Sequence, residues 1–252
     1  MIKALSRTSV DLKTTEVISS LLQILNTKKA RYNDKVETLE KEYARLIGVK
    51  EAVAFPYSRT GTYYALMALE LQEGDEVIMP AFTFWVDAAM VVMAGLKPVF
   101  VDVNFETQSI DTALIENAIT PRTKVIYPTH LNGLPADMDQ IMRIAEKHDL
   151  RVMEDCARSC GATYKDKRIG SFDIGSFSFG YGKSFYGFGG AMVTSDNTAF
   201  IKKLRDLKKD FKHISLKNLC IQTLKGSLLK YLNISYFYRF SIFPMVYKFQ
   251  VE

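Results

Sequence analysis

The feature that most constrains the fold of this chain is a regular alternation of short apolar runs with stretches of helical periodicity. Seven runs have the length and apolar content of buried strands, at residues 52–55, 76–79, 98–103, 124–127, 150–154, 174–179 and 191–194. Apolar residues recur at helical spacing in four of the intervals, at residues 63–71, 85–94, 112–118 and 138–148. Apolar strands covered by helices on both faces are typical of a mostly parallel sheet. We therefore expect an α/β fold whose ligand site lies in the loops that follow the strands.

Two further amphipathic helices are predicted before the first strand, at residues 15–25 and 33–47. In the second helix the following apolar residues share one face: Val36, Leu39, Tyr43 and Leu46. No repeat, low-complexity tract or flexible linker marks a boundary before about residue 209. We expect one domain over residues 1–210 and an amphipathic helical tail over residues 211–252.

The composition is that of an ordinary globular protein. Apolar residues make up 48% of the 252 residues and charged residues 24%, which argues against disordered, collagen-like and coiled-coil chains. The net charge of +5 is far below the charge density of a nucleic-acid-binding protein. The three cysteines indicate neither a disulfide framework nor a zinc site, and no apolar run reaches the ~18 residues that span a bilayer. We expect a cytoplasmic protein without a nucleic-acid partner.

A lysine in a glycine-rich turn is the main chemical signal. Lys183 lies between Gly182 and Ser184, just after the predicted strand 174–179, and glycines recur at positions 187, 189 and 190. A partly buried amine has a lowered pKa, which makes it a nucleophile toward an aldehyde. For an isolated lysine, a solvated loop position is the more common interpretation.

Three other signals also follow predicted strands. Asp155 is placed to hold a protonated ring nitrogen, although an aspartate there is more often a helix N-cap. The turn with Ser58, Arg59 and Thr60 precedes a helix and suits an anion, although a helix cap alone needs only one hydroxyl. Phe84 is placed to stack on a flat heterocycle, although most such aromatic rings pack in the core. Each signal is weak, but all fall at the same edge of the predicted sheet.

A set of ordered motifs runs through the chain between residues 33 and 206. They are GDEVI at 74–78, PAFTF at 80–84, PVFVD at 98–102, ITPRTK at 119–124, PADM at 135–138, EDCA at 154–157, GATY at 161–164 and GSFSF at 175–179. With these motifs the chain resembles the DegT/DnrJ/EryC1/StrS family of sugar aminotransferases, which are pyridoxal 5′-phosphate (PLP) enzymes of fold type I. The resemblance implies a large PLP-binding domain like that of aspartate aminotransferase.

The resemblance also implies residue roles. Lys183 would form the Schiff base with PLP and later move protons at the substrate carbon, and Asp155 would hold the pyridine nitrogen. The remaining cofactor contacts, for ring stacking and phosphate binding, would be Phe84, Ser178, Arg59 and Thr60. Arg158 stands where the family often has Gln or His, and is expected to donate to the phenolic oxygen of the cofactor.

Two departures from the family make the substrate less certain than the cofactor. Phe188 stands where a glutamate usually precedes the paired glycines. Family members generally continue into a smaller C-terminal domain, whereas this chain has only the tail after residue 210, so we expect a truncated protein or a fragment.

The leading functional hypothesis is transfer of an amino group, with glutamate as donor, to a keto-sugar linked to a nucleotide, by a homodimer. A dehydratase of the same family is disfavoured, because those enzymes have histidine in place of the lysine. The alternative from another class is a catalytically impaired homologue that acts as a binding module or contacts a membrane surface through its basic, aromatic tail.

Overall fold

The computed structural model describes residues 34–187, 189–209 and 211. It also describes scattered residues of the flanking segments, at 15, 18, 19, 22, 217, 218, 220, 221, 223–225 and 228. Most of the predicted helix at residues 15–25, most of the predicted tail and Phe188 therefore lie outside the described residues. Among those described, no helix has the length and apolar character needed to cross a bilayer.

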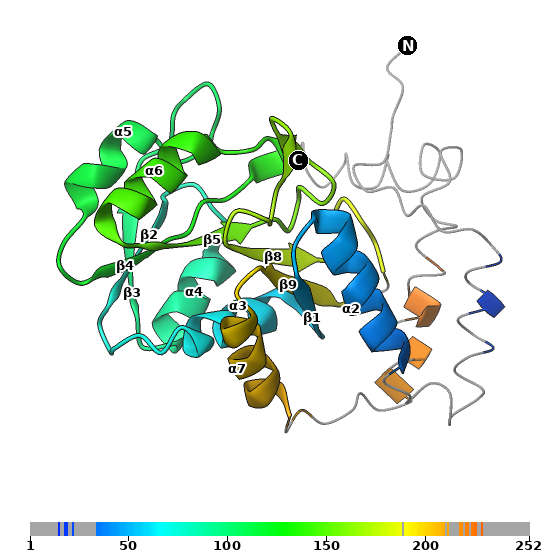
Figure 1. The fold of residues 1–252 in the computed structure, drawn as a ribbon. Coiled ribbons are helices and arrows are strands. Elements are labelled where there is room, and N and C mark those ends of the chain that lie inside the picture. The colour runs from blue at the N-terminus through cyan, green and yellow to red at the C-terminus, as the bar shows by residue number, and fades with distance from the viewer. Residues whose placement is uncertain are drawn as a thin grey trace, which may run out of the picture.

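A seven-stranded sheet forms the centre of the molecule, in the order β1-β9-β8-β5-β4-β2-β3 (Figure 1). The strands are β1 (Glu51–Phe55), β2 (Glu76–Pro80), β3 (Lys97–Val101), β4 (Thr123–Ile126), β5 (Arg151–Asp155), β8 (Ile174–Ser178) and β9 (Ala191–Ser195). β9 is antiparallel to both of its neighbours, and every other neighbouring pair is parallel. The predicted α/β fold with a mostly parallel sheet is confirmed, and each of the seven predicted strands corresponds to an observed one.

Helices cover both faces of the sheet (Figure 1). One core contains residues of α2 (Asp34–Ile47), α5 (Thr112–Ile115) and α6 (Met138–His148). The other contains residues of α3 (Ser58–Ala68), α4 (Trp85–Met93) and α7 (Thr198–Lys208). Successive side chains of a strand point alternately into the two cores. In β2, Ile78 points into the first core, and Val77 and Met79 point into the second.

Three short elements complete the described chain: the 3-10 helices η2 (Glu116–Ala118) and η3 (Leu131–Gly133), and a hairpin of β6 (Thr163–Tyr164) and β7 (Lys167–Arg168). Side-chain caps fix where two of the longer helices begin. Asp137 accepts a hydrogen bond from the backbone N–H of Gln140 at the start of α6, and Asn197 accepts one from Phe200 at the start of α7.

The apolar stripe predicted for residues 33–47 is wrong in part. Of its four members only Tyr43 is buried in α2, and the other three are exposed. The buried face of the helix instead contains Glu40, Tyr43, Ala44 and Ile47. Glu40 is buried because its carboxylate accepts hydrogen bonds from the backbone N–H of Ala54 in β1 (2.7 Å) and from Arg205 in α7 (2.6 Å).

Side chains close the free edge of β1. The Ala54 N–H on that edge donates to Glu40, and the carbonyl of Ala52 accepts a hydrogen bond from Arg205 Nη2 at 2.9 Å. An edge strand with unpaired backbone groups is a template for pairing with another chain. α2 and α7 therefore protect this edge with an ion pair instead of an eighth strand.

Candidate active site

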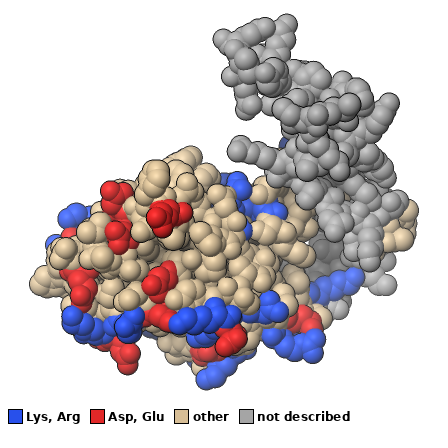
Figure 2. Space-filling model, turned by 90° about the horizontal axis from the view of Figure 1, so that it is seen from above, with Lys and Arg blue, Asp and Glu red and all other residues tan. Residues whose placement is uncertain are grey.

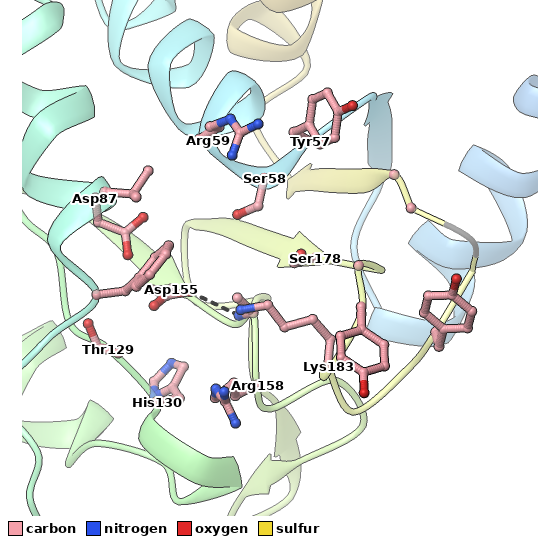
Figure 3. Close-up of a pocket in the computed structure, with 18 of the residues that line it drawn as sticks. Tyr57, Ser58, Arg59, Asp87, Thr129, His130, Asp155, Arg158, Ser178 and Lys183 are labelled. Carbon is pink, nitrogen blue, oxygen red and sulfur yellow. Dashed lines mark hydrogen bonds between the residues drawn. The ribbon is translucent and has the colours of Figure 1, made fainter. Parts of the chain in front are cut away.

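A cavity of about 550 Å³ lies at the carboxyl edge of the sheet. Five strands run in the same direction toward it, so the loops that follow them converge. Lining residues that follow β1, β2, β4, β5 and β8 include Tyr57, Ser58, Arg59, Phe84, Asp87, Thr129, His130, Asp155, Arg158, Ser178 and Lys183 (Figure 3). The volume is in the range of about 300–1,000 Å³ that is usual for small-molecule sites.

Lys183 is half-buried and points into this cavity (Figure 3). Its loop is held in place by two hydrogen bonds, from the backbone N–H of Lys183 to the carbonyl of Gly180 (3.3 Å) and from the Ser184 hydroxyl to the carbonyl of Arg158 (2.6 Å). Burial lowers the pKa of the Lys183 ammonium, and Arg158 lowers it further, whereas Asp155 and Asp87 act in the opposite direction. The lysine is therefore closer to its nucleophilic, neutral form than a surface lysine.

Asp155 ends β5 and is only 6% exposed. Its side chain accepts a hydrogen bond from the backbone N–H of Ala157 at 2.9 Å. Burial raises the pKa of the Asp155 carboxyl, while the Ala157 hydrogen bond and the charges of Lys183 and Arg158 oppose that increase. Asp155 forms no ion pair of 4.0 Å or less among the described residues, so a cationic group in the cavity would be its natural partner.

Phe84 is the N-cap residue of α4 and is 55% exposed. The Nζ atom of Lys183 lies 5.8 Å from the centroid of its ring. The ring, the amine and the carboxylate of Asp155 thus border the same cavity. A flat heterocycle placed against Phe84 would have the amine and the acid within reach.

Polar groups at the start of α3 form another part of the wall. The helix begins at Ser58, five residues earlier than predicted, and its N-cap residue Tyr57 makes no side-chain cap. Ser58 and Arg59 line the cavity, and the Arg59 guanidinium lies 4.7 Å from the centroid of the Tyr57 ring. Together with Ser178 at the end of β8, these groups suit an anion such as a phosphate.

The structure thus brings together six of the seven residues singled out from the sequence: Lys183, Asp155, Phe84, Ser178, Arg59 and Arg158. Thr60 belongs to the same helical turn as Arg59 but is not among the lining residues.

A buried hydrogen-bonded pair, His130 and Glu154, supports the floor of the site. His130 Nδ1 accepts a hydrogen bond from the backbone N–H of Ala136 (3.1 Å), so its Nε2–H donates to Glu154 at 3.0 Å. Glu154 also accepts hydrogen bonds from the backbone N–H groups of Gly170 (2.8 Å) and Phe172 (2.9 Å). His130, Glu154 and Cys156 lie close enough to resemble a metal site, but these hydrogen bonds already satisfy the imidazole and the carboxylate.

Sequence reasoning missed Asp87, a second buried carboxylate in the cavity wall. The sequence does contain a signal for it, because Asp87 is the single charged residue among the nine residues of α4. A charged side chain in an otherwise apolar helix is rarely buried without a specific role.

Comparison with known proteins decides the family. The family model for the DegT/DnrJ/EryC1/StrS aminotransferases matches residues 12–219. The chain belongs to this family. A relative in the DegT/DnrJ/EryC1/StrS family from Acidithiobacillus ferrooxidans, named UDP-N-acetyl-3-dehydro-α-D-glucosamine 3-aminotransferase, is 45% identical over 196 residues, which are 77% of this chain and 53% of the relative.

Two solved structures have the same fold as this DegT/DnrJ/EryC1/StrS family member. NtdA from Bacillus subtilis with bound cofactor PMP is 29% identical, with a TM-score of 0.74, and the match covers 93% of this chain and 57% of NtdA. DesI in the presence of its TDP-sugar product is 30% identical, with a TM-score of 0.74, and the match covers 82% and 53% of the two chains. The chain therefore spans about half the length of the relatives it matches.

Proposed function

We propose that the protein is a PLP-dependent aminotransferase that transfers an amino group to the keto group of a nucleotide-linked sugar. The observation that carries this proposal is the meeting of Lys183, Asp155 and Phe84 in one cavity. Family membership adds support, because the stretch that matches the family model contains all three residues.

The residues of the cavity fit the parts of PLP. When bound, this cofactor supplies an aldehyde that takes up an amino group and a ring that withdraws electrons from the substrate carbon. Lys183 would bind the aldehyde carbon covalently and Asp155 would bind the ring nitrogen. Phe84 would lie against the ring, and the phosphate would be held by Ser58, Arg59 and Ser178, while Arg158 would donate to the phenolic oxygen.

The protein's own groups would also move the protons. Lys183 is half-buried and its ammonium has a lowered pKa, so it can accept a proton from the substrate carbon and return it more readily than a surface lysine. Asp155 is held in place by the Ala157 N–H, which keeps its carboxylate directed at one point in the cavity. The buried His130–Glu154 pair fixes the loop that follows β4 beneath these groups.

The proposed substrate class follows from the relatives. One is named for an aminotransferase acting on a UDP-linked 3-keto sugar, and another was solved with a TDP-sugar product. We propose a nucleotide-linked keto-sugar as acceptor and glutamate as amino donor. Biosynthesis of amino sugars for surface polysaccharides would be the corresponding pathway class.

The organisation of the protein is proposed on the same basis. Residues 1–210 would form the PLP-binding domain and residues 211–252 a helical tail, in a cytoplasmic homodimer. Exposed apolar side chains on α4 and β3 support self-association: Trp85, Val92, Met93 and Phe100. No nucleic-acid partner is proposed, because acidic and basic side chains are interleaved along the lower edge of the face shown in Figure 2.

Reduction of the purified full chain with borohydride in the presence of PLP tests the proposal. We expect a stable adduct on Lys183, located by peptide mass spectrometry, and its loss in Lys183→Arg. Lys225 also lines the cavity, so Lys225→Arg is the matched control and should keep the adduct. No adduct, or an adduct on Lys225 instead, would show that the proposed function is wrong.

A further inference from the structure

Asp87 is a buried acid that the proposed reaction does not use. Its side chain is only 5% exposed, and it lines the same cavity as Asp155 (Figure 3). The hydroxyl of Tyr127, itself 1% exposed, donates to Asp87 Oδ1 at 3.2 Å. The Tyr127 hydroxyl is also 3.3 Å from Thr62 Oγ1, which lies 3.1 Å from Ser176 Oγ. A chain of hydroxyl groups therefore leads from the sheet to Asp87.

Two carboxyl groups thus share one buried space. Asp87 and Asp155 are 5% and 6% exposed, and neither forms an ion pair among the described residues. Taking one unpaired carboxylate out of water is already costly, and a second negative charge nearby adds repulsion. Two such groups favour holding one proton in common.

The surroundings of the two acids decide which of them holds the proton. Asp155 has a backbone N–H donor and the nearby charges of Lys183 and Arg158. Among the residues that the structure describes, Asp87 has the Tyr127 hydroxyl and a weaker effect from Lys183. From α3, Arg59 reaches the cavity but lies over the ring of Tyr57. Burial and the charge of Asp155 hold the pKa of the Asp87 carboxyl well above its usual range.

We propose that Asp87 and Asp155 hold one proton between them, and that Asp87 is the positioning residue that carries it and leaves the single negative charge of the pair on Asp155. The consequence for catalysis rests on the proposed function: one carboxylate, at a fixed position, would face the ring nitrogen of the cofactor. The proton assignment itself concerns only residues of this chain and is testable without cofactor.

Infrared spectroscopy of the cofactor-free full chain at pH 7 tests the assignment. A protonated carboxylic acid has a carbonyl stretch that a carboxylate lacks, so the difference spectrum of wild type minus Asp87→Asn should contain this band. The difference spectrum of wild type minus Asp155→Asn should not contain it. Absence of the band from the wild-type protein, or its loss in Asp155→Asn but not in Asp87→Asn, would overturn the proposal.

The pH dependence of stability gives a second readout. The folded state holds a proton that the unfolded state has released above a pKa of about 4. The unfolding equilibrium constant should therefore rise with pH by up to tenfold per pH unit, between that value and the pKa of folded Asp87. Asp87→Asn removes this dependence, and its melting temperature should exceed that of the wild type more at pH 8 than at pH 5.

Glu76→Gln is a control in which the effect of the substitution on stability should change with pH in the opposite direction. Glu76 is also 5% exposed, but hydrogen bonds from Thr120 and Lys97 lower the pKa of its carboxyl. This variant should lose stability at pH 8 and lose less at low pH. If the stability of the wild type and of Asp87→Asn depended equally on pH, the proton assignment would be refuted. Absence of the borohydride adduct on Lys183 would refute only the PLP function.

Discussion

At the scale of single residues, the reactivity of Lys183 is set by opposing charges. Burial and Arg158 lower the pKa of its ammonium, while Asp155 and Asp87 raise it. If Asp87 is neutral, its contribution disappears and the amine is more easily deprotonated. Arg158 thus lowers the pKa of the Lys183 ammonium, in addition to any contact that it makes with a ligand.

Replacing Arg158 by glutamine tests this effect. Arg158→Gln removes a positive charge near the amine, so the pKa of Lys183 should rise and less neutral amine should exist at pH 7. Each unit of pKa increase lowers the neutral fraction about tenfold. The rate of adduct formation with PLP, followed by absorbance, should fall at pH 7 and approach the wild-type rate at high pH. Arg122 lies just before β4, at the amino edge of the sheet and away from the cavity, so Arg122→Gln should leave the rate of adduct formation unchanged.

Much of the candidate site was predictable from residue types and positions. Lys183, Asp155 and Phe84 each follow an apolar run, and parallel strands bring such positions to one edge. Asp87 was not predicted because it lies inside a helix, and only the packing of α4 on the sheet shows that it is directed at the cavity.

At the scale of elements, strands were easier to predict than the faces of helices. A buried strand is apolar on both faces, so its sequence alone identifies it. In α2 the exposed apolar residues misled the prediction, and the buried Glu40 has a partner that is 165 positions away. Local periodicity contains no information about such a partner.

The Glu40–Arg205 pair should contribute more to stability than a surface pair. Arg205→Leu leaves the carboxylate of Glu40 buried with Lys208, at 3.5 Å, as its remaining cation among the described residues, and frees the carbonyl of Ala52. We expect a loss of about 1.5–3 kcal/mol in the free energy of unfolding, measured by urea titration. Arg45→Leu breaks an exposed pair with Glu42 and should cost about 0–1 kcal/mol. Similar losses in the two variants would contradict this explanation.

At the scale of the whole molecule, the largest exposed apolar side chains of α4 and β3 lie on adjacent elements. Trp85 is 73% exposed and Met93 is 65% exposed. Apolar surface of this kind on a folded protein usually marks an interaction site. Because Phe84 precedes Trp85, a second copy bound here would lie next to the mouth of the cavity.

Self-association through this surface is testable with charged substitutions. The double variant Val92→Asp/Met93→Asp places two negative charges on the end of α4, so the dimer dissociation constant should rise by at least about tenfold if each charge costs roughly 1 kcal/mol or more. Sedimentation velocity measures the change. Leu46→Asp, on the exposed side of α2, is the control and should leave the association intact. A monomeric wild-type protein would refute the proposed dimer.

The position of β9 also has a consequence for how the chain acquires its shape during synthesis. Glu51 of β1 pairs with Ser195 of β9, so the first strand joins the sheet only through the last. β1 leads to Ser58 and Arg59 at the start of α3, and α3 contacts β8 and α4 as well as β9. While β9 is still to be made, α3 can therefore pack on the sheet, but β1 lacks its neighbouring strand. We expect the part of the candidate site that contains Ser58 and Arg59 to reach its final position only after residue 195 has been synthesised.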